Sequence, residues 1–320
     1  MFLQIHLVYR REGRFHEGQH NIIKPPIKKK HVYDTVYNEL FCMRLADRIG
    51  LMVPNCFVIP GKHPLLVIER YDRSVKGDNI QRLHQQDFCQ AQGLTSQSKY
   101  QRDGGPSFAD NYKFLVKHVA IKYRSKDQFR LLDWLAFNLL IGNCDSHSKN
   151  LSLINVPQGV RLAPFYDLLT IPIYKSLPKE FAFVIGGCEN IFDISKKNIE
   201  TLEEELSIKK GSLVKKIDNI ALKISLEKKR LIGELRQEYG QIPIFNELSK
   251  FIDSRIKCLG KYGVVSKKTL EAKPKTIKGK MDEKEIICSK PGCKNKVIER
   301  KNSNPLRIEA GLCSKHFHET

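Results

Sequence analysis

Apolar residues in the first 70 positions follow the short spacing of strands, with one helical stretch among them. Strands are predicted at 2–10, 20–24, 56–59 and 65–68. The first two are separated by a turn at Gly13 and are expected to pair antiparallel. Residues 34–50 carry helical spacing, with Asp34 as a candidate capping residue. The pattern predicts a small sheet with one helix.

The spacing changes after Arg73, where residues 74–105 are polar and rich in turn residues. Helices are predicted at 111–123 and 127–141, a hairpin at 151–155 and 160–163, and helical texture throughout 196–262. A lysine-rich stretch, 267–280, has no apolar periodicity and is typical of a flexible linker. We therefore divide the chain into a small lobe at 1–72, a mainly helical lobe at 73–262, a basic linker at 263–284 and a tail at 285–320.

Composition narrows the class of protein. The 320 residues carry a formal charge of +20, with 41% hydrophobic and 28% charged residues, which is typical of a globular chain of about two domains. The sequence has no apolar run of about 18 residues, so a membrane span is excluded, and its opening segment lacks the pattern of a secretory signal. Most of the nine cysteines are scattered, which indicates a reducing cytoplasm. The positive charge favours anionic partners, such as nucleotides or nucleic acid.

The polar loop at 142–152 lies between two apolar stretches and carries the residues of most chemical interest. Asp145 and Asn150 are five positions apart, and a second acid, Asp167, follows the predicted hairpin. Phosphoryl transfer uses such a set, with one aspartate to orient the attacking hydroxyl and an asparagine and a second aspartate to hold Mg²⁺. The Asp-x4-Asn spacing equals that of the protein-kinase catalytic loop. Lys149 is a candidate to meet the transferring phosphate as a point charge.

The same residues have simpler interpretations. Asp145 and Asn150 are also typical of a loop in which side chains satisfy backbone groups, and His147 is typical of a packed or hydrogen-bonded histidine. Cys144 and His147 suggest a thiol nucleophile, but two residues so close in one loop rarely have the required geometry. The spacing alone does not choose between a catalytic and a structural loop.

Longer motifs give the loop a family context. Residues 143–150 and 162–168 closely resemble the N-x-D-x-H-x-K-N and L-A-P-x-Y-D-L signatures of the HipA family of bacterial toxin serine/threonine kinases. Other segments that fit the family pattern are 20–25, 38–46, 68–73, 84–91, 104–107 and 185–187. The resemblance spans residues 7–255, and the agreement of several motifs in one order makes it specific.

The resemblance implies a two-lobed, protein-kinase-like α+β fold with a reduced N-lobe. Asp145 would be the catalytic base, and Asn150 and Asp167 would bind Mg²⁺. For ATP, the implied contacts are Lys24 with the phosphates and the backbone of Glu69, Arg70 and Tyr71 with the adenine. Ile22 and Leu153 are candidates for the two faces of the ring, although each is also typical of an ordinary core residue. Protein kinases also suggest a Lys24–Glu39 ion pair, although Glu39 could equally be a surface residue of its helix.

The implied activity is ATP- and Mg²⁺-dependent phosphorylation of a serine or threonine in a translation-related protein, with aminoacyl-tRNA synthetases among the family's targets. A DNA-binding, HipB-like antitoxin is the implied partner. The chain departs from the family pattern at its start, which comes too late for the glycine-rich phosphate loop and the small N-terminal subdomain. A misassigned start, a separate polypeptide that supplies the missing part, or a decayed remnant would each explain this. The competing hypothesis is a catalytically impaired pseudokinase that binds an antitoxin or nucleic acid.

The tail has a metal-ligand pattern that is not part of the usual family. Cys288 and Cys293, followed by Cys313 and His316, form a C-x4-C and C-x2-H pattern that matches a structural Zn²⁺ site, with His318 as an alternative ligand. The alternative is three free thiols, but a short tail has too little core to fold alone. Basic residues nearby suggest nucleic-acid contact, so a zinc-dependent nucleic-acid binder with incidental kinase ancestry is a third hypothesis.

Overall fold

The computed structural model describes residues 10–11, 14–15, 20–76, 79–95, 97–272, 284–287 and 296–299. Within this set, residues 20–272 belong to one compact unit. A second unit contains two antiparallel hairpins: β1 (Arg10–Arg11) with β2 (Arg14–Phe15), and β13 (Lys284–Ile287) with β14 (Lys296–Glu299). All of the strand predicted at 2–10 except Arg10 lies outside the described residues.

A three-stranded antiparallel sheet opens the compact unit. Its spatial order is β3 (Asn21–Lys24), β5 (Leu65–Glu69), β4 (Cys56–Ile59), and each strand agrees with a predicted one. Ile22 of β3 lies opposite Ile68 of β5, and Lys24 lies opposite Leu66. Lys24 is the last residue of β3, where the chain leaves the sheet toward the first helix.

The first helix, α1 (Thr35–Arg48), agrees with the helix predicted at 34–50. The predicted cap is wrong, because the side chain of Asp34 makes no capping hydrogen bond. Asp34 has a left-handed backbone with φ 49°, whereas a capping residue is usually extended, so that its side chain can accept from an N–H of the first helical turn. Nearly all of α1 is buried, and Leu40 and Phe41 are 0% exposed. A helix that is buried around most of its surface needs cover from more than one direction.

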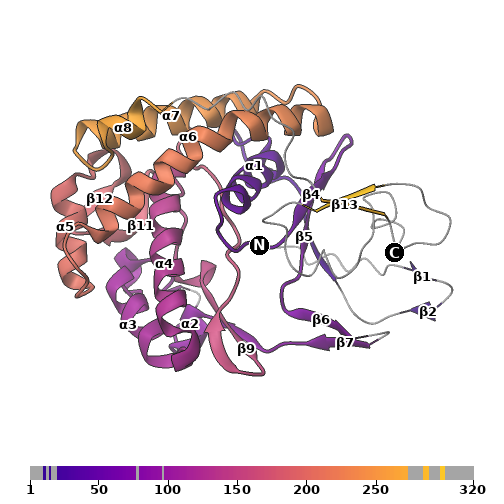
Figure 1. Ribbon diagram of the computed structural model, residues 1–320, viewed down its shortest axis with the longest axis horizontal. Coiled ribbons are helices and arrows are strands. Elements are labelled where there is room, and N and C mark those ends of the chain that lie inside the picture. Colours follow the sequence, from indigo (N-terminus) through magenta and orange to yellow (C-terminus); the bar gives the residue numbers. More distant parts are fainter. Residues whose placement is uncertain are drawn as a thin grey trace. The chain divides into compact units, whose positions relative to one another are not determined.

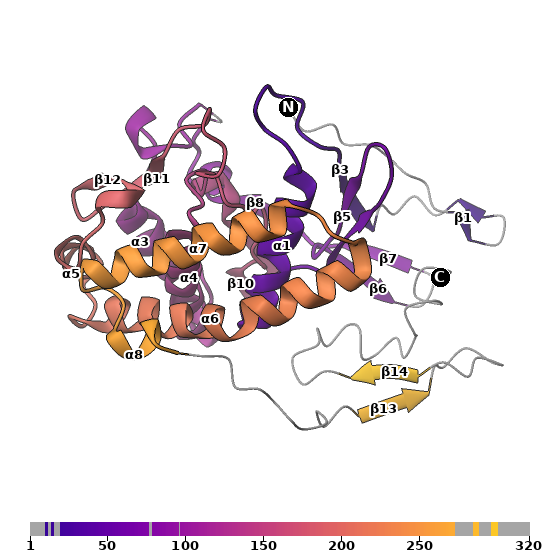
Figure 2. The same cartoon turned by 90° about the horizontal axis from the view of Figure 1, so that it is seen from above.

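The cover on α1 comes from two different parts of the chain. One side contacts β4 and β5, and the other contacts the long helices α6 (Ser212–Tyr239) and α7 (Ile244–Lys261), which run side by side (Figures 1 and 2). Arg48, the last residue of α1, forms ion pairs with Glu227, at 3.2 Å, and with Glu234 of α6. The first helix is therefore fixed to the C-terminal helices by packing and by charge.

The segment predicted to be turn-rich contains regular structure. It holds the hairpin of β6 (Arg73–Lys76) and β7 (Asn79–Arg82), then β8 (Gln85–Asp87), α2 (Phe88–Ala91) and the short 3₁₀ helix η1 (Gln101–Asp103). β8 pairs with β9 (Ser152–Val156), which pairs with β10 (Gly159–Leu162), and these last two strands agree with the predicted hairpin. β8 escapes prediction because its residues, Gln85 to Asp87, are all polar.

The helices of the larger lobe are α3 (Phe108–His118), α4 (Ile121–Ile141) and α5 (Lys196–Glu205), together with α6 and α7. The break between α3 and α4 falls at Val119 and Ala120 and not at 124–126 as predicted. Val119 is extended, and the Ala120 N–H donates to the Val160 carbonyl of β10 at 2.9 Å, so a tertiary contact sets the break. A short helix, α8 (Lys267–Leu270), capped by Ser266, begins the stretch that was predicted to be a linker.

The remaining elements are small. They are η2 (Ser148–Asn150), β11 (Glu180–Ile185), β12 (Cys188–Asn190) and η3 (Ile191–Asp193). The core of the larger lobe centres on Trp134, which is fully buried and contacts the rings of Phe165 and Phe183. No helix in the part of the chain that the structure describes is long and apolar enough to cross a membrane.

Candidate active site

Three charged side chains from separate parts of the chain meet at the end of β3. Lys24 Nζ lies 2.6 Å from Glu39 Oε1 of α1 and 2.8 Å from Asp167 Oδ1. The three side chains are between 9% and 17% exposed, so their charges interact with little screening by water. The ion pair suggested by the kinase analogy is therefore present, and Glu39 is not a surface residue.

One cation is shared by two carboxylates, and this sharing controls the pKa of each group. Burial lowers the pKa of Lys24, but Asp167 and Glu39 outweigh it and raise that pKa above its ordinary value. Burial raises the pKa of Glu39 to about 7 against the opposing charge of Lys24. Burial also opposes the ionisation of Asp167, but the charge and hydrogen bond of Lys24 hold its pKa below the usual value. With both acids ionised the group has an excess negative charge, which a divalent cation would neutralise.

Asp167 lies in a segment without helix or strand, between 163 and 171, and its backbone is left-handed with φ 58°. Such a conformation is costly for a residue with a Cβ, so neighbouring contacts must hold it. Asn143 contributes one of them, since its Nδ2 donates to the Asp167 carbonyl at 3.2 Å and to Asn138 Oδ1 at 2.8 Å. Asn143 Oδ1 is buried and has no protein partner, a situation that ordered water usually relieves.

The loop that begins at Gly142 carries the predicted base and the second predicted Mg²⁺ ligand. Asn150 Nδ2 donates to the backbone carbonyl of Asp145 at 2.9 Å, which leaves the amide oxygen of Asn150 as the atom available to a metal. The side chain of Asp145 is 42% exposed and can therefore meet a hydroxyl from a second molecule. Its Oδ1 accepts a hydrogen bond from the Tyr100 hydroxyl and lies 3.8 Å from His147 Nε2.

His147 lies beside the predicted base, with its Nε2 3.8 Å from Asp145 Oδ1. Burial lowers its pKa, and the carboxylates of Asp145 and Asp167 both act in the opposite direction. One buried imidazole is therefore within electrostatic reach of both acids. Its ring also meets the ring of Tyr100 edge-on, with centroids 5.1 Å apart. Direct contacts thus bring Lys24, Glu39 and Asp167 together and join Asp145 to Asn150, and His147 lies beside Asp145.

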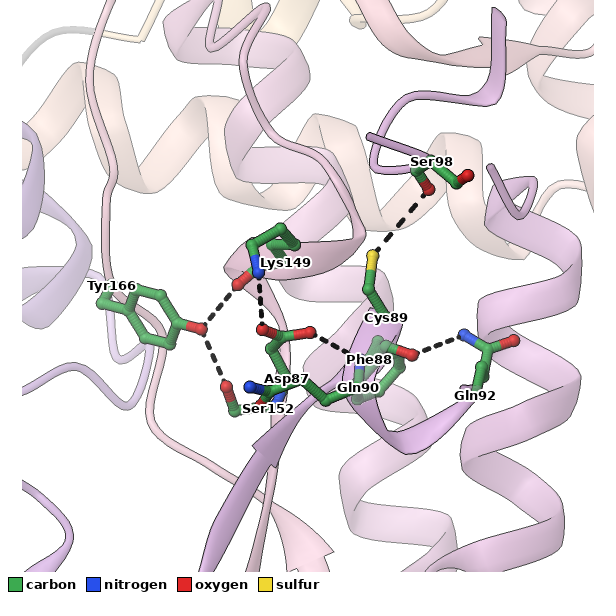
Figure 3. A network of polar contacts seen from close by, with 9 residues as sticks. All are labelled: Asp87, Phe88, Cys89, Gln90, Gln92, Ser98, Lys149, Ser152 and Tyr166. Carbon is green, nitrogen blue, oxygen red and sulfur yellow. Dashed lines mark hydrogen bonds and ion pairs between the residues drawn. The ribbon is translucent and has the colours of Figure 1, made fainter. Parts of the chain in front are cut away.

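Lys149, predicted to meet a phosphate, is held by an acid that the sequence analysis did not single out. Its Nζ lies 3.0 Å from Asp87 Oδ2, and the other oxygen of Asp87 caps α2 by accepting from the Gln90 N–H at 2.8 Å (Figure 3). Tyr166 OH lies on the other side, where it donates to the Lys149 carbonyl and is 2.7 Å from Ser152 Oγ. The contact of β8 with β9 places Asp87 here, which only the tertiary fold reveals.

A pocket of about 240 Å³ lies beside these groups. Its lining consists of Ile22, Lys24, Pro54, Ile68, Glu69, Arg70, Tyr71, Asp72, Gln85, Asp87, Gln90, Ser152 and Tyr166. Ile22 is thus in the lining as expected, whereas Leu153 is buried in the core. The rings of Tyr71 and Tyr166 stack with centroids 6.1 Å apart and give the pocket an aromatic wall.

Residues 69–71 border this pocket; they belong to the segment that resembles the family's hinge between lobes, and their backbone is expected to receive the adenine. The Glu69 N–H donates to the Asn55 carbonyl at 2.9 Å, and the Arg70 N–H donates to the His20 carbonyl at 2.7 Å. The guanidinium of Arg70 is bound by Asp72 through two hydrogen bonds. Of the three hinge N–H groups, that of Tyr71 is therefore the candidate donor to an adenine ring.

The donor set fits Mg²⁺ delivered with a nucleotide. An amide oxygen from Asn150 and a carboxylate from Asp167 are hard ligands, and Mg²⁺ in such sites takes few protein ligands and completes its shell with phosphate oxygens and water. The residues that the structure describes contain no cluster of three His, Cys, Asp or Glu side chains able to hold a metal by themselves. Cys288, Cys293, Cys313 and His316 lie outside the described residues, so zinc in the tail stays a prediction.

Comparisons with known proteins agree with a kinase-like fold. A chain of the Shewanella oneidensis HipA, HipB and operator DNA complex matches with a TM-score of 0.67 and 23% identity, covering 85% of this chain and 68% of that one. The Helicobacter pylori proinflammatory kinase CtkA matches with a TM-score of 0.52 and 12% identity, covering 81% and 91%. These likenesses show an α+β, HipA- and kinase-like fold.

The sequence comparisons show the family. Residues 4–227 match the HipA-like C-terminal domain, and the chain belongs to that family. A Sinorhizobium fredii protein named "Putative kinase Y4mE" is 34% identical over 241 residues, 74% of this chain and 56% of the relative. The Shewanella oneidensis "Serine/threonine-protein kinase toxin HipA" is 29% identical over 209 residues, 62% of this chain and 48% of the relative. The chain thus spans about half the length of these curated relatives.

Proposed function

We propose that this chain is a Mg²⁺- and ATP-dependent kinase that phosphorylates serine or threonine hydroxyls of another protein, as the toxin of a toxin–antitoxin pair. The observation that carries the proposal is the shared contact of Lys24 with Glu39 and Asp167, beside a loop that exposes Asp145. Phosphoryl transfer is catalysed mainly by positioning and by charge stabilisation, and these groups supply both.

Each residue has a defined role in this proposal. Lys24 binds phosphate oxygens while Glu39 holds its ammonium in place. Asn150 and Asp167 hold Mg²⁺, which neutralises phosphate charge when it is bound with ATP. Asp145 accepts the proton of the acceptor hydroxyl as its oxygen bonds to the γ-phosphorus and the bond to ADP breaks. Tyr71, Tyr166 and Ile22 surround the adenine. Lys149, which is paired with Asp87, meets the transferring phosphate with its positive charge.

The matched relatives support a proposal about partners. The matched solved complex contains HipA, HipB and operator DNA, and we propose that this chain likewise binds a HipB-like, DNA-binding antitoxin. We propose a translation-related protein, of the aminoacyl-tRNA synthetase class, as the substrate.

The test of the proposal is radiolabelled phosphate transfer from ATP to cell-extract proteins, with and without Mg²⁺. Asp145→Asn should abolish transfer and leave Mg²⁺-dependent ATP binding, measured by thermal shift, intact. The matched control is Glu189→Gln, which changes an exposed acid in β12. Nucleotide binding without any Asp145-dependent transfer would favour the pseudokinase, and absence of both would refute the proposal.

A further inference from the structure

Asn38, one residue before Glu39 on α1, is fully buried and makes a two-point contact with residues 163–171, here called the metal-binding segment because it contains the proposed Mg²⁺ ligand Asp167. Its Oδ1 accepts from the Thr170 N–H at 2.9 Å, and its Nδ2 donates to the Thr170 carbonyl at 2.8 Å. Nδ2 also lies 3.1 Å from the Tyr174 hydroxyl. A side-chain amide thus satisfies both backbone groups of one residue, as a neighbouring strand would.

The location of Thr170 gives this contact its importance. Thr170 is 0% exposed and lies three positions after Asp167, in the segment that has no helix or strand of its own. Buried backbone groups outside a ladder must find other partners, and Asn38 supplies both at this position. The thiol of Cys42, one turn further along α1, lies 3.6 Å from both Asn38 Oδ1 and Thr170 Oγ1 and closes the contact.

Two bridges therefore join α1 to the same short segment. The outer bridge runs from Glu39 through Lys24 to Asp167, and the inner bridge runs directly from Asn38 to Thr170. If ATP and Mg²⁺ bind as proposed, Lys24 and Asp167 gain new partners, and the contacts of the outer bridge become weaker. None of the groups proposed to bind ATP or Mg²⁺ takes part in the inner bridge, so nucleotide binding would leave it intact.

We propose that Asn38 is a positioning residue for the Mg²⁺ ligand Asp167, and that α1 and the metal-binding segment form one unit with and without nucleotide. The inference rests on the proposed function, in which Asp167 binds Mg²⁺. Protein kinases that are regulated through this helix move its glutamate away from the lysine. In this protein the same movement would leave the buried N–H and carbonyl of Thr170 without hydrogen-bond partners.

The test is binding of the ATP analogue AMP-PNP, measured by calorimetry with Mg²⁺ and again with EDTA. In Asn38→Ala, affinity with Mg²⁺ should fall by on the order of tenfold, as is usual when a residue that supports a metal ligand is removed. Affinity in EDTA should stay within about twofold of the wild type, because the adenine pocket and the Lys24–Glu39 pair are unchanged. Asn38→Ser breaks the two-point contact but keeps a small, uncharged hydroxyl for one of the Thr170 backbone groups, so it should show an intermediate loss and covers the case in which the alanine variant does not fold.

Asn198→Ala is the matched control, since Asn198 Nδ2 donates to the Gly186 carbonyl at 2.9 Å, and neither residue contacts the candidate site. It should lose stability and keep the gain in affinity that Mg²⁺ provides. Equal losses in Mg²⁺ and EDTA, or a full Mg²⁺ gain in both Asn38 variants, would overturn the inference while the proposed function stands. A wild type that binds AMP-PNP no better with Mg²⁺ would instead overturn the proposed function together with the inference.

Discussion

Lys24 Nζ and Glu39 Oε1 are 2.6 Å apart, although 15 positions separate the two residues in the chain. The contact joins the end of a strand to the second turn of a helix and buries both charges. An arrangement of this kind costs desolvation, so its presence beside a second acid, Asp167, indicates a site that is built for a charged ligand.

Removing the lysine should separate its structural role from its proposed catalytic role. Lys24→Met leaves Glu39 and Asp167 buried without a counter-ion, and the free energy of unfolding should fall by roughly 3 kcal/mol. The double variant Lys24→Met/Glu39→Gln should recover part of that stability but none of the phosphate transfer. Urea unfolding and radiolabel transfer measure the two effects. Unchanged ATP affinity in Lys24→Met would contradict its proposed contact with phosphate.

The raised pKa of Glu39 predicts a pH dependence of stability. Its pKa is about 7 in the folded protein against 4.5 ordinarily, so the folded state holds the proton more tightly. The resulting stability is fully present below pH 4.5 and is lost as pH rises through 7. Relative to Glu39→Gln, which cannot titrate, the wild type should lose up to about 3 kcal/mol across this window. Urea unfolding at several pH values measures the difference, and parallel curves would contradict the prediction.

The hydrogen bond from Tyr100 to Asp145 predicts a selective effect on transfer. Tyr100→Phe removes a donor to one carboxylate oxygen and should lower the transfer rate by roughly tenfold, the usual worth of a hydrogen bond to a charged group. ATP affinity should not change, because Tyr100 does not line the nucleotide pocket. Tyr123→Phe, which removes an exposed hydroxyl bonded to Gln158, is the control. An increased rate in Tyr100→Phe would mean that the phenol obstructs the acceptor.

Asp87 has two contacts that different substitutions can separate. Asp87→Asn keeps a side chain able to cap α2 and loses the charge that holds Lys149, whereas Asp87→Ala loses both. Thermal or urea unfolding should show a loss of about 1 kcal/mol for the alanine variant and little for the asparagine variant. Both should reduce phosphate transfer to the extent that Lys149→Ala does. Full activity in all three would remove Lys149 from the proposed site.

The sequence predicts the elements whose own residues carry the signal. The strands at β3, β4 and β5, the helix α1 and the hairpin β9–β10 have apolar spacing that burial requires, and the motif residues Asp145, Asn150 and Asp167 stand out as polar groups in apolar surroundings. Tyr166 belongs to the Y-D-L part of the family motif, so the sequence already indicated that it lies in the site. The predicted side-chain cap at Asp34 is wrong because the backbone conformation of a single residue depends on tertiary contacts, which a local sequence pattern does not contain.

Other parts depend on contacts that no local pattern contains. β8 is polar and exists because β9 pairs with it, and this pairing brings Asp87 to Lys149. Tyr100 lies in a polar, turn-rich segment and gains its role only through the turn that returns its hydroxyl to Asp145. Asn38 looks like an ordinary polar position on a helix until the backbone of Thr170 is placed against it.

The ion pairs of Arg48 bear on how the protein can be shortened. The family match ends at residue 227, inside α6, whereas Glu234 and all of α7 lie beyond it. A chain that ended at residue 227 would lack part of α6 and all of α7, which cover α1. Phe41, which stacks on Phe245, would then face water. The smallest piece that keeps the lysine and glutamate in register therefore extends to the end of α7, well past the limit that sequence similarity marks.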